Sequence, residues 1–202
     1  MISIAMATYN GAKFIREQID SILVQTIQDF ELVICDDCST DETSDILQTY
    51  AKEDLRIRTY RNEKNMGFKR NFELALKLTH GDYIALCDQD DVWTPDHLSS
   101  LYEQAKTGTK LLVCGGSELV DTKGGDLERT LFWAESYDRI TNDEIENAYT
   151  LLFFRNPFQG ASMMIRREFL DYALPIPNGV GYHDAWFSAL AWERFNPVKA
   201  QN

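Results

Sequence analysis

Residues 83–91 read YIALCDQDD, in which an apolar run from Tyr83 to Cys87 is followed at once by three carboxylates. The run has the length and composition of a buried strand, and it ends abruptly at Asp88. Like charges this close together repel one another, which costs stability unless a cation lies among them. Mg²⁺ and Mn²⁺ prefer such oxygen ligands and often share them with a substrate phosphate. We therefore expect a strand end that holds a divalent metal for a phosphorylated substrate, with a solvated acidic turn as the alternative.

Apolar strand-like runs alternate with amphipathic helix-like segments on both sides of this stretch. Strands are expected at 2–7, 30–35, 56–61, 83–87, 110–114 and 161–165. Helices are expected at 14–23, 39–50, 69–78, 94–106, 140–154 and 184–193, with a turn at Gly124-Gly125. Ser39 and Glu42 have the spacing of a capping box, and Thr94-Pro95 is typical of a helix start. This alternation predicts βαβ units in a single α/β domain, with a mostly parallel sheet flanked by helices.

Length and charge limit the classes of function. The chain has 202 residues, of which 44% are hydrophobic, enough for one well-packed domain and short for two. Its net charge of −12 argues against nucleic acid as a partner, because phosphate backbones require a basic face. No apolar run approaches the roughly 20 residues of a membrane span, and the N-terminal run lacks the basic flank of a signal peptide. We expect a cytoplasmic protein; contact with the inner face of the membrane and homo-oligomerisation stay open.

The four cysteines are Cys35, Cys38, Cys87 and Cys114. Three of them fall within or at the ends of strand-like runs, where a free thiol behaves as a small hydrophobic group. Cys35-x-x-Cys38 could form half of a zinc or redox site, but no second pair or nearby histidine completes it. Reduced thiols are therefore the favoured interpretation.

Polar clusters follow three of the expected strands. They are Thr8-Tyr9-Asn10, Asp36-Asp37 and the acidic stretch 88–91. Ligands of open α/β sheets collect at the carboxyl ends of the strands, where a Tyr ring can stack on a base and a carboxylate can accept from an imide N–H. Each cluster alone could be an ordinary turn or cap, whereas three at matching ends indicate a nucleotide site. The sequence has no P-loop motif and no GxGxxG after the first strand.

A further carboxylate, Asp184, stands among aromatic residues in the stretch Gly181-Tyr182-His183-Asp184-Ala185-Trp186-Phe187. A carboxylate at a helix start beside aromatic side chains is well placed to act as a general base under partial desolvation. The alternative is an N-cap aspartate with no catalytic role. Spacing alone does not separate the two.

Taken together and in order, these motifs resemble those of the family 2 glycosyltransferases, which are inverting enzymes of the GT-A fold. Within that family, the acidic motif and the His-Asp-x-Trp motif are most similar to bacterial enzymes that build surface polysaccharides, including rhamnosyltransferase-like proteins. The segments that carry the resemblance are 3–11, 21–26, 31–41, 65–67, 70–71, 80–84, 88–90, 160–164 and 183–186.

The resemblance implies a role for each matching residue. Ala7 and Tyr9 would line the base pocket, Asp37 would accept from the base imide, and Asp88 would face the ribose or metal-bound water. Asp90 would bind Mn²⁺ or Mg²⁺ at the donor diphosphate, with Asp91 in support. Asp184 matches the catalytic base that deprotonates an acceptor hydroxyl. The expected donor is a UDP- or dTDP-sugar, and the acceptor a glycan or a lipid- or protein-linked glycoconjugate.

By the same resemblance, residues 1–115 would form the nucleotide-sugar half of one GT-A domain and residues 116–202 the acceptor half. Cys38 stands where the family usually has glycine, and many relatives continue beyond the Asp184 helix, so a compact version and a module of a longer protein both stay open.

Two other functions also stay open. A sugar-phosphate nucleotidyltransferase would need a Gly-rich, Arg-containing loop after the first strand, which residues 9–13 do not provide. A non-catalytic sugar-nucleotide-binding or assembly module is the other.

Overall fold

The computed structural model describes residues 1–107, 111–116, 118–120, 126–130, 158–195 and 198–199. Its strands are β1 (Ile2–Thr8), β2 (Phe30–Asp36), β3 (Ile57–Arg61), β4 (Tyr83–Cys87), β5 (Leu112–Cys114), β6 (Glu118–Val120), β7 (Asp126–Thr130), β8 (Met163–Arg166) and β9 (Val198–Lys199). Its helices are α1 (Ile15–Leu23), α2 (Thr43–Glu53), α3 (Phe68–Leu78), α4 (His97–Thr107), α7 (Leu170–Ala173) and α8 (His183–Phe195), with 3₁₀ turns η1 (Gly160–Ser162) and η2 (Arg167–Phe169). The helix expected at 140–154 and the turn at Gly124-Gly125 lie outside the described residues.

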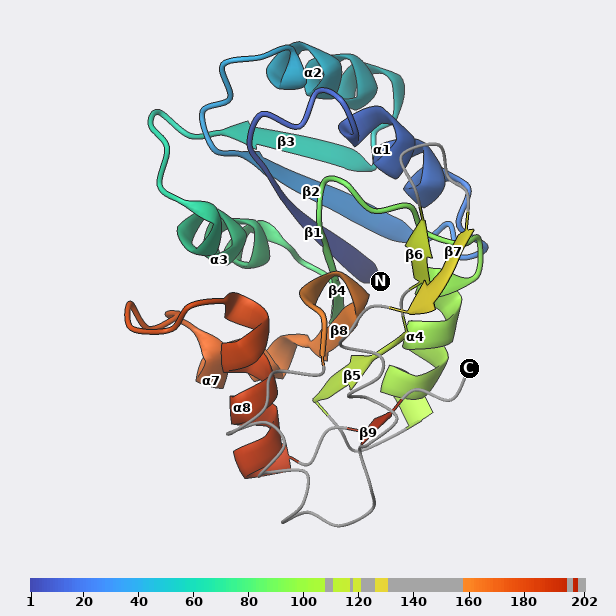
Figure 1. The fold of residues 1–202 in the computed structure, drawn as a ribbon, viewed down its shortest axis with the longest axis vertical. Coiled ribbons are helices and arrows are strands. Elements are labelled where there is room, and N and C mark those ends of the chain that lie inside the picture. Colours follow the sequence, from blue (N-terminus) through green and yellow to red (C-terminus); the bar gives the residue numbers. More distant parts are fainter. Residues whose placement is uncertain (108–110, 117, 121–125, 131–157, 196–197, 200–202) are drawn as a thin grey trace.

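The main sheet has the strand order β3-β2-β1-β4-β8-β5-β9, and β6 pairs separately with β7. Strands β1 to β4 are parallel to one another, whereas β8 runs antiparallel to both β4 and β5. The predicted α/β fold with a mostly parallel sheet flanked by helices is therefore confirmed. Because β1, β2 and β4 are adjacent and parallel, their carboxyl ends lie at the same edge of the sheet (Figure 1).

Two layers of helices cover the sheet, and the alternation of side chains along β1 explains why. Ile2, Ile4 and Met6 point into a core shared with α1, α2 and α4. Ala5, on the opposite face, belongs to a second core shared with α3, α7 and α8. Figure 1 shows these two groups of helices on different sides of the sheet. Successive side chains of a strand point to opposite faces, so an almost wholly apolar β1 needs cover on both.

Two expected helix starts are wrong by a few residues. Helix α2 begins at Thr43 rather than at Ser39, and its N-cap Glu42 makes no side-chain capping bond. The Ser39 hydroxyl instead bonds to the Asp36 carboxylate, so the predicted capping box does not form. Helix α4 begins at His97, after Thr94-Pro95, whose carbonyls bond to His97 N–H and Thr26 N–H. Among the described helices, none combines the length and hydrophobicity needed to cross a bilayer.

Candidate active site

The ends of β1 and β4 are joined by one amide side chain. Gln89 Oε1 accepts from Thr8 Oγ1 at 2.6 Å and from Tyr9 N–H at 3.0 Å. Asp37 N–H in turn donates to Thr8 C=O at 2.9 Å, which ties the end of β2 to the same point. Ala7 is half-buried in β1, and Tyr9 beyond the strand end is 45% exposed. The three polar clusters predicted from the sequence thus meet at one edge of the sheet.

Asp37 is a buried carboxylate that organises the loop before α3. Its Oδ1 accepts from Asn62 Nδ2 and Met66 N–H, both at 2.8 Å, and its Oδ2 accepts from Gly67 N–H at 2.8 Å. A carboxylate has about four acceptor positions, so one on Oδ2 stays available for a further donor. The predicted contact with a base imide is therefore compatible with this geometry. Asp37 also holds the loop before α3, a structural role that the sequence did not suggest.

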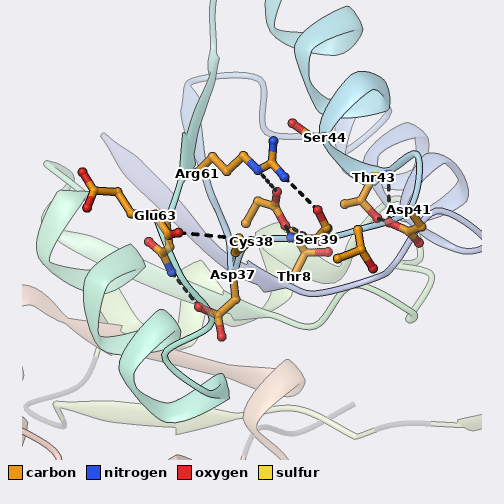
Figure 2. Close-up of polar contacts among 12 residues, drawn as sticks. Thr8, Asp37, Cys38, Ser39, Asp41, Thr43, Ser44, Arg61 and Glu63 are labelled. Atoms are coloured by element: carbon orange, nitrogen blue, oxygen red, sulfur yellow. Dashed lines mark hydrogen bonds and ion pairs between the residues drawn. The ribbon is translucent and has the colours of Figure 1, made fainter.

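Asp36 holds the turn that follows β2, in which Arg61 lies beside Ser39 (Figure 2). Its Oδ1 accepts from Ser39 N–H at 3.1 Å, and Arg61 Nε lies 3.5 Å from Oδ2. Arg61 also donates to Ser39 C=O at 2.8 Å. Within this turn Cys38 has φ 65°, the left-handed region that favours glycine. The bonds to Asp36 therefore support a backbone conformation that a cysteine does not readily adopt.

The acidic stretch 88–91 is crowded with negative charge. Burial raises the pKa of Asp88 to about 7, with further contributions from Asp91, Asp90 and Asp184. Burial and Asp90 raise the pKa of Asp91 to about 6, and Asp91 Oδ2 is buried without a hydrogen-bond partner. Asp90 is exposed. The hard oxygen donors, their mutual repulsion and the unpaired Oδ2 all fit a divalent cation.

These carboxylates do not form a complete metal cage. Within the described part of the chain, no group of three or more His, Cys, Asp or Glu side chains is arranged to hold an ion. An ion bound at Asp90 would therefore need most of its ligands from water or substrate, as is usual for Mg²⁺ beside phosphates.

Asp184 lies in the first turn of α8, and the fold brings it to the acidic stretch. Its charge contributes to the raised pKa of Asp88 and to that of Cys114 at the end of β5. Its Oδ1 accepts from Ala185 N–H at 2.6 Å. Gly160 in η1 lies against this turn and leaves room for the neighbouring His183 ring, since a Cβ there would lie 2.7 Å from His183 Nε2. Because α8 begins at His183, Asp184 is not the N-cap residue that the alternative interpretation required.

His183, next to Asp184, is buried where α3, η1 and α8 meet. Its ring stacks on Phe72 with centroids 4.3 Å apart and meets the edge of Phe187 at 5.9 Å. Both ring nitrogens are buried without a hydrogen-bond partner, and burial lowers the pKa of His183 to about 4. The imidazole is therefore a neutral packing group that fixes the first turn of α8 against α3.

The sequence profile described as "Glycosyl transferase family 2" matches residues 3–172, which include the ends of β1, β2 and β4. The chain belongs to glycosyl transferase family 2. Asp184 lies beyond the matched residues of this family 2 chain, so its assignment depends on the geometry described above.

Two curated bacterial relatives share a large part of this family 2 chain. TuaG of Bacillus subtilis, provisionally named a teichuronic acid biosynthesis glycosyltransferase, is 32% identical over 157 residues, 77% of this chain and 62% of its own. WfaP of Escherichia coli, named a UDP-Glc:alpha-D-GlcNAc-diphosphoundecaprenol beta-1,3-glucosyltransferase, is 38% identical over 100 residues, 50% of this chain and 39% of its own. The chain thus spans less than two thirds of the length of either relative.

Solved structures agree on the fold. S. aureus TarS 1–349 in complex with UDP-GlcNAc has a TM-score of 0.70 at 24% identity, over 95% of this chain and 53% of TarS. The mannosyltransferase PcManGT from Pyrobaculum calidifontis was solved in complex with GDP-Man and Mn²⁺. It has a TM-score of 0.70 at 22% identity, over 91% of this chain and 49% of PcManGT. The expected GT-A architecture is confirmed by these neighbours.

Two residues of the site had no role in the sequence-based prediction. Gln89 bonds to Thr8 and Tyr9, as described above. Asn71 Nδ2 donates to Cys35 C=O at 2.7 Å, and its Oδ1 accepts from Asn62 Nδ2 at 2.9 Å. The sequence did hold a signal for Asn71: it is a polar amide next to Phe72, on the side of α3 that faces the core. A buried amide needs hydrogen-bond partners, so its position indicates a specific contact.

Proposed function

We propose that this family 2 chain carries the catalytic site of a metal-dependent, inverting glycosyltransferase that uses a nucleotide-diphosphate sugar. The observation that carries the proposal is the position of Asp184 near the acidic stretch 88–91. Asp184 lies against Gly160 of η1, the strand β8 that follows η1 pairs with β4, and the charge of Asp184 contributes to the raised pKa of Asp88. Transfer in one displacement needs a base and a site for the leaving diphosphate within the span of one sugar. These two groups come from distant parts of the sequence, and a purely structural role for either would not require their proximity.

The donor nucleotide would lie along the ends of β1, β2 and β4. Tyr9, 45% exposed, offers a ring for the nucleobase, and the half-buried Ala7 near the end of β1 would line the same pocket. Asp37 Oδ2 has acceptor capacity for an imide N–H, which uridine and thymidine share. Asp88, at the boundary between this pocket and the acidic stretch, would face the ribose. UDP- and dTDP-sugars are therefore the proposed donors.

Asp90 would hold Mn²⁺ or Mg²⁺, with Asp91 in support. When bound, the ion would offset negative charge on the diphosphate as it leaves. PcManGT, a neighbour of the same fold, was solved with Mn²⁺. Burial, and after it the neighbouring carboxylates, raise the pKa of Asp88 and Asp91, and a cation bound there would stabilise their charged forms.

Asp184 would act as the general base. It would accept the proton of an acceptor hydroxyl while that oxygen forms a bond to the anomeric carbon of the donor sugar. The bond from the anomeric carbon to the diphosphate oxygen breaks on the opposite side, and the leaving nucleoside diphosphate takes the electron pair. Attack opposite the leaving group inverts the anomeric configuration. The proposed acceptors are hydroxyls of glycans or glycoconjugates, the class named for WfaP.

Substitution of Asp184 by Asn should abolish transfer and leave nucleotide binding unchanged, because the amide keeps the shape but cannot take a proton. A thermal-shift panel of nucleotide sugars with Mn²⁺ first identifies the donor. Transfer to mixed glycan acceptors, with and without EDTA, is then compared between the wild type and the variant. Wild-type turnover by Asp184→Asn would refute the base assignment, and pyrophosphate release from a nucleoside triphosphate would favour the nucleotidyltransferase.

Substitution of Asp90 by Ala should weaken nucleotide binding in manganese by at least tenfold and have little effect in EDTA. Isothermal titration with UDP under both conditions measures the difference. Asp96→Ala, which removes an exposed carboxylate just before α4, is the matched control and should bind like the wild type. Equal affinity of Asp90→Ala and wild type in manganese would count against a metal ligand at this position.

A further inference from the structure

Two aromatic side chains stand exposed beside the proposed base. Phe68, the first residue of α3, is 49% exposed, and Tyr182, just before α8, is 67% exposed. Their ring centroids lie 5.8 Å apart with an interplanar angle of 35°. Single exposed apolar side chains are ordinary on a protein surface, whereas two adjacent rings form a contiguous apolar face that a ligand can cover. We refer to Phe68 and Tyr182 as the aromatic pair.

The chain that carries Tyr182 is fastened to α3. Lys69 Nζ donates to Asn178 C=O at 3.3 Å and also bonds to Val180 C=O. Arg70 bonds to the Asn178 side chain, and Arg70 Nη1 also pairs with Glu73 at 2.5 Å. Glu73 Oε2 accepts in addition from Ile176 N–H at 3.2 Å. The 176–182 segment therefore presents Tyr182 from a fixed position despite its exposure.

The aromatic pair spans the two halves of the proposed reaction. Phe68 directly follows Gly67, whose N–H bonds to Asp37 in the nucleotide site. Tyr182 stands two residues before Asp184, and its C=O accepts from Trp186 N–H at 3.3 Å within α8. Along the chain, each ring is thus within two residues of a group of the proposed site.

The two glycines before Tyr182 lie in open surroundings. A Cβ built on Gly179 or on Gly181 would meet no atom within 4 Å. The neighbouring side chains, Lys69 and Asn178, are polar. A pyranose has an apolar face of C–H groups and a polar rim of hydroxyls, which suits an aromatic ring bordered by polar groups. A lipid surface would require a larger apolar patch than two rings provide.

We propose that the aromatic pair is the platform for the acceptor sugar, which stacks its apolar face on Tyr182 and directs a hydroxyl to Asp184. This inference rests on the proposed glycosyl transfer and specifies its acceptor as a pyranose ring rather than a flexible alcohol. Tyr9, just after β1, is the proposed stacking partner of the nucleobase, so the aromatic pair is left for the acceptor.

The kinetic test compares Tyr182→Ala, Phe68→Ala and Tyr182→Trp with the wild type. We expect the acceptor KM to rise at least fivefold in the two alanine variants, while the donor KM and the rate of donor hydrolysis stay within twofold. Tyr182→Trp should restore the acceptor KM, because the indole preserves a stacking face. Tyr172→Ala, which removes an aromatic side chain of 47% exposure on α7, is the control and should leave all three constants unchanged.

An unchanged acceptor KM in Tyr182→Ala, or an equal rise in the donor KM, would overturn the inference. Saturation-transfer NMR with a set of methyl pyranosides separates its failure from that of the proposed function. Saturation of the sugar ring protons that is seen with the wild type and lost in Tyr182→Ala supports the platform, even when no glycosyl transfer is detected. If the sugar ring protons are not saturated with the wild type, or are still saturated with Tyr182→Ala, the platform is contradicted whatever the enzymatic activity.

Discussion

Gln89 shows how one side chain couples two strand ends that carry different parts of the site. Its carbonyl oxygen satisfies the Thr8 hydroxyl and the Tyr9 N–H together. Tyr9 is the proposed base-stacking residue, and Gln89 is flanked by the proposed ribose and metal carboxylates. A neutral amide can make this bridge without adding a fourth charge to the acidic stretch 88–91.

Replacing Gln89 by Leu should lower both stability and nucleotide affinity. The variant leaves two donors without their partner, which costs on the order of 1–3 kcal/mol. UDP affinity in manganese should fall several-fold because the Tyr9 loop is no longer held. Urea unfolding and calorimetric titration measure the two effects, with Gln48→Leu on the exposed side of α2 as control. Unchanged UDP affinity in a destabilised Gln89→Leu would mean that the bridge is structural only.

The turn between β2 and α2 shows why an element boundary can be misjudged. Ser39 and Glu42 have the local spacing of a capping box, but the buried Asp36 carboxylate competes for the Ser39 hydroxyl and N–H. Asp41 instead bonds to Thr43 N–H at 3.0 Å, and α2 begins there. A capping rule considers only the adjacent backbone, whereas this serine is held by a strand end that the sheet buries.

The left-handed conformation of Cys38 gives a prediction for this same turn. A non-glycine residue there costs roughly 1–2 kcal/mol, and a β-branched residue costs more. Cys38→Gly should therefore be at least as stable as the wild type, and Cys38→Val should be less stable by about 1–2 kcal/mol. Chemical denaturation of the three proteins measures the order. Equal stability of the Val and Gly variants would show that the turn relaxes to another backbone conformation.

At the scale of the whole molecule, stability in mild acid depends on groups that are buried uncharged. Burial lowers the pKa of His183 to about 4, below its ordinary value of 6.5. The unfolded chain therefore binds a proton that the folded chain does not, between pH 6.5 and 4. The contribution of His183 to stability is complete above pH 6.5 and is lost as the pH falls through this interval.

His183→Phe keeps a stacked ring on Phe72 and removes this titration. Relative to the wild type, the variant should gain about 1–2 kcal/mol of unfolding free energy when the pH is lowered from 7 to 5. Urea unfolding at both pH values gives the comparison. Phe187→Leu alters a neighbouring ring but keeps the imidazole. The difference in unfolding free energy between this variant and the wild type should not depend on pH. A pH-independent difference for His183→Phe would mean that the histidine has the same pKa in the folded protein as in the unfolded chain.

Most of the architecture could be predicted from the sequence because its signals are local. The run 83–87 matches β4 at both ends, and the expected strands at 2–7 and 30–35 are each one residue short. The antiparallel direction of β8 could not be predicted, because apolar alternation is the same in either direction. Its place between β4 and β5 follows from which edges the other strands leave unpaired.

By itself, the sequence determined the α/β class, the family and the strand ends where polar residues collect, since each depends on patterns within a few residues. The tertiary structure alone decided that Asp184 lies near the acidic stretch 88–91, that Asp37 supports the loop before α3, and that Tyr182 is held beside Phe68. These are contacts between distant segments. Their existence depends on the packing of α3 and α8 against one face of the sheet, where side-chain shape rather than periodicity determines which residues meet.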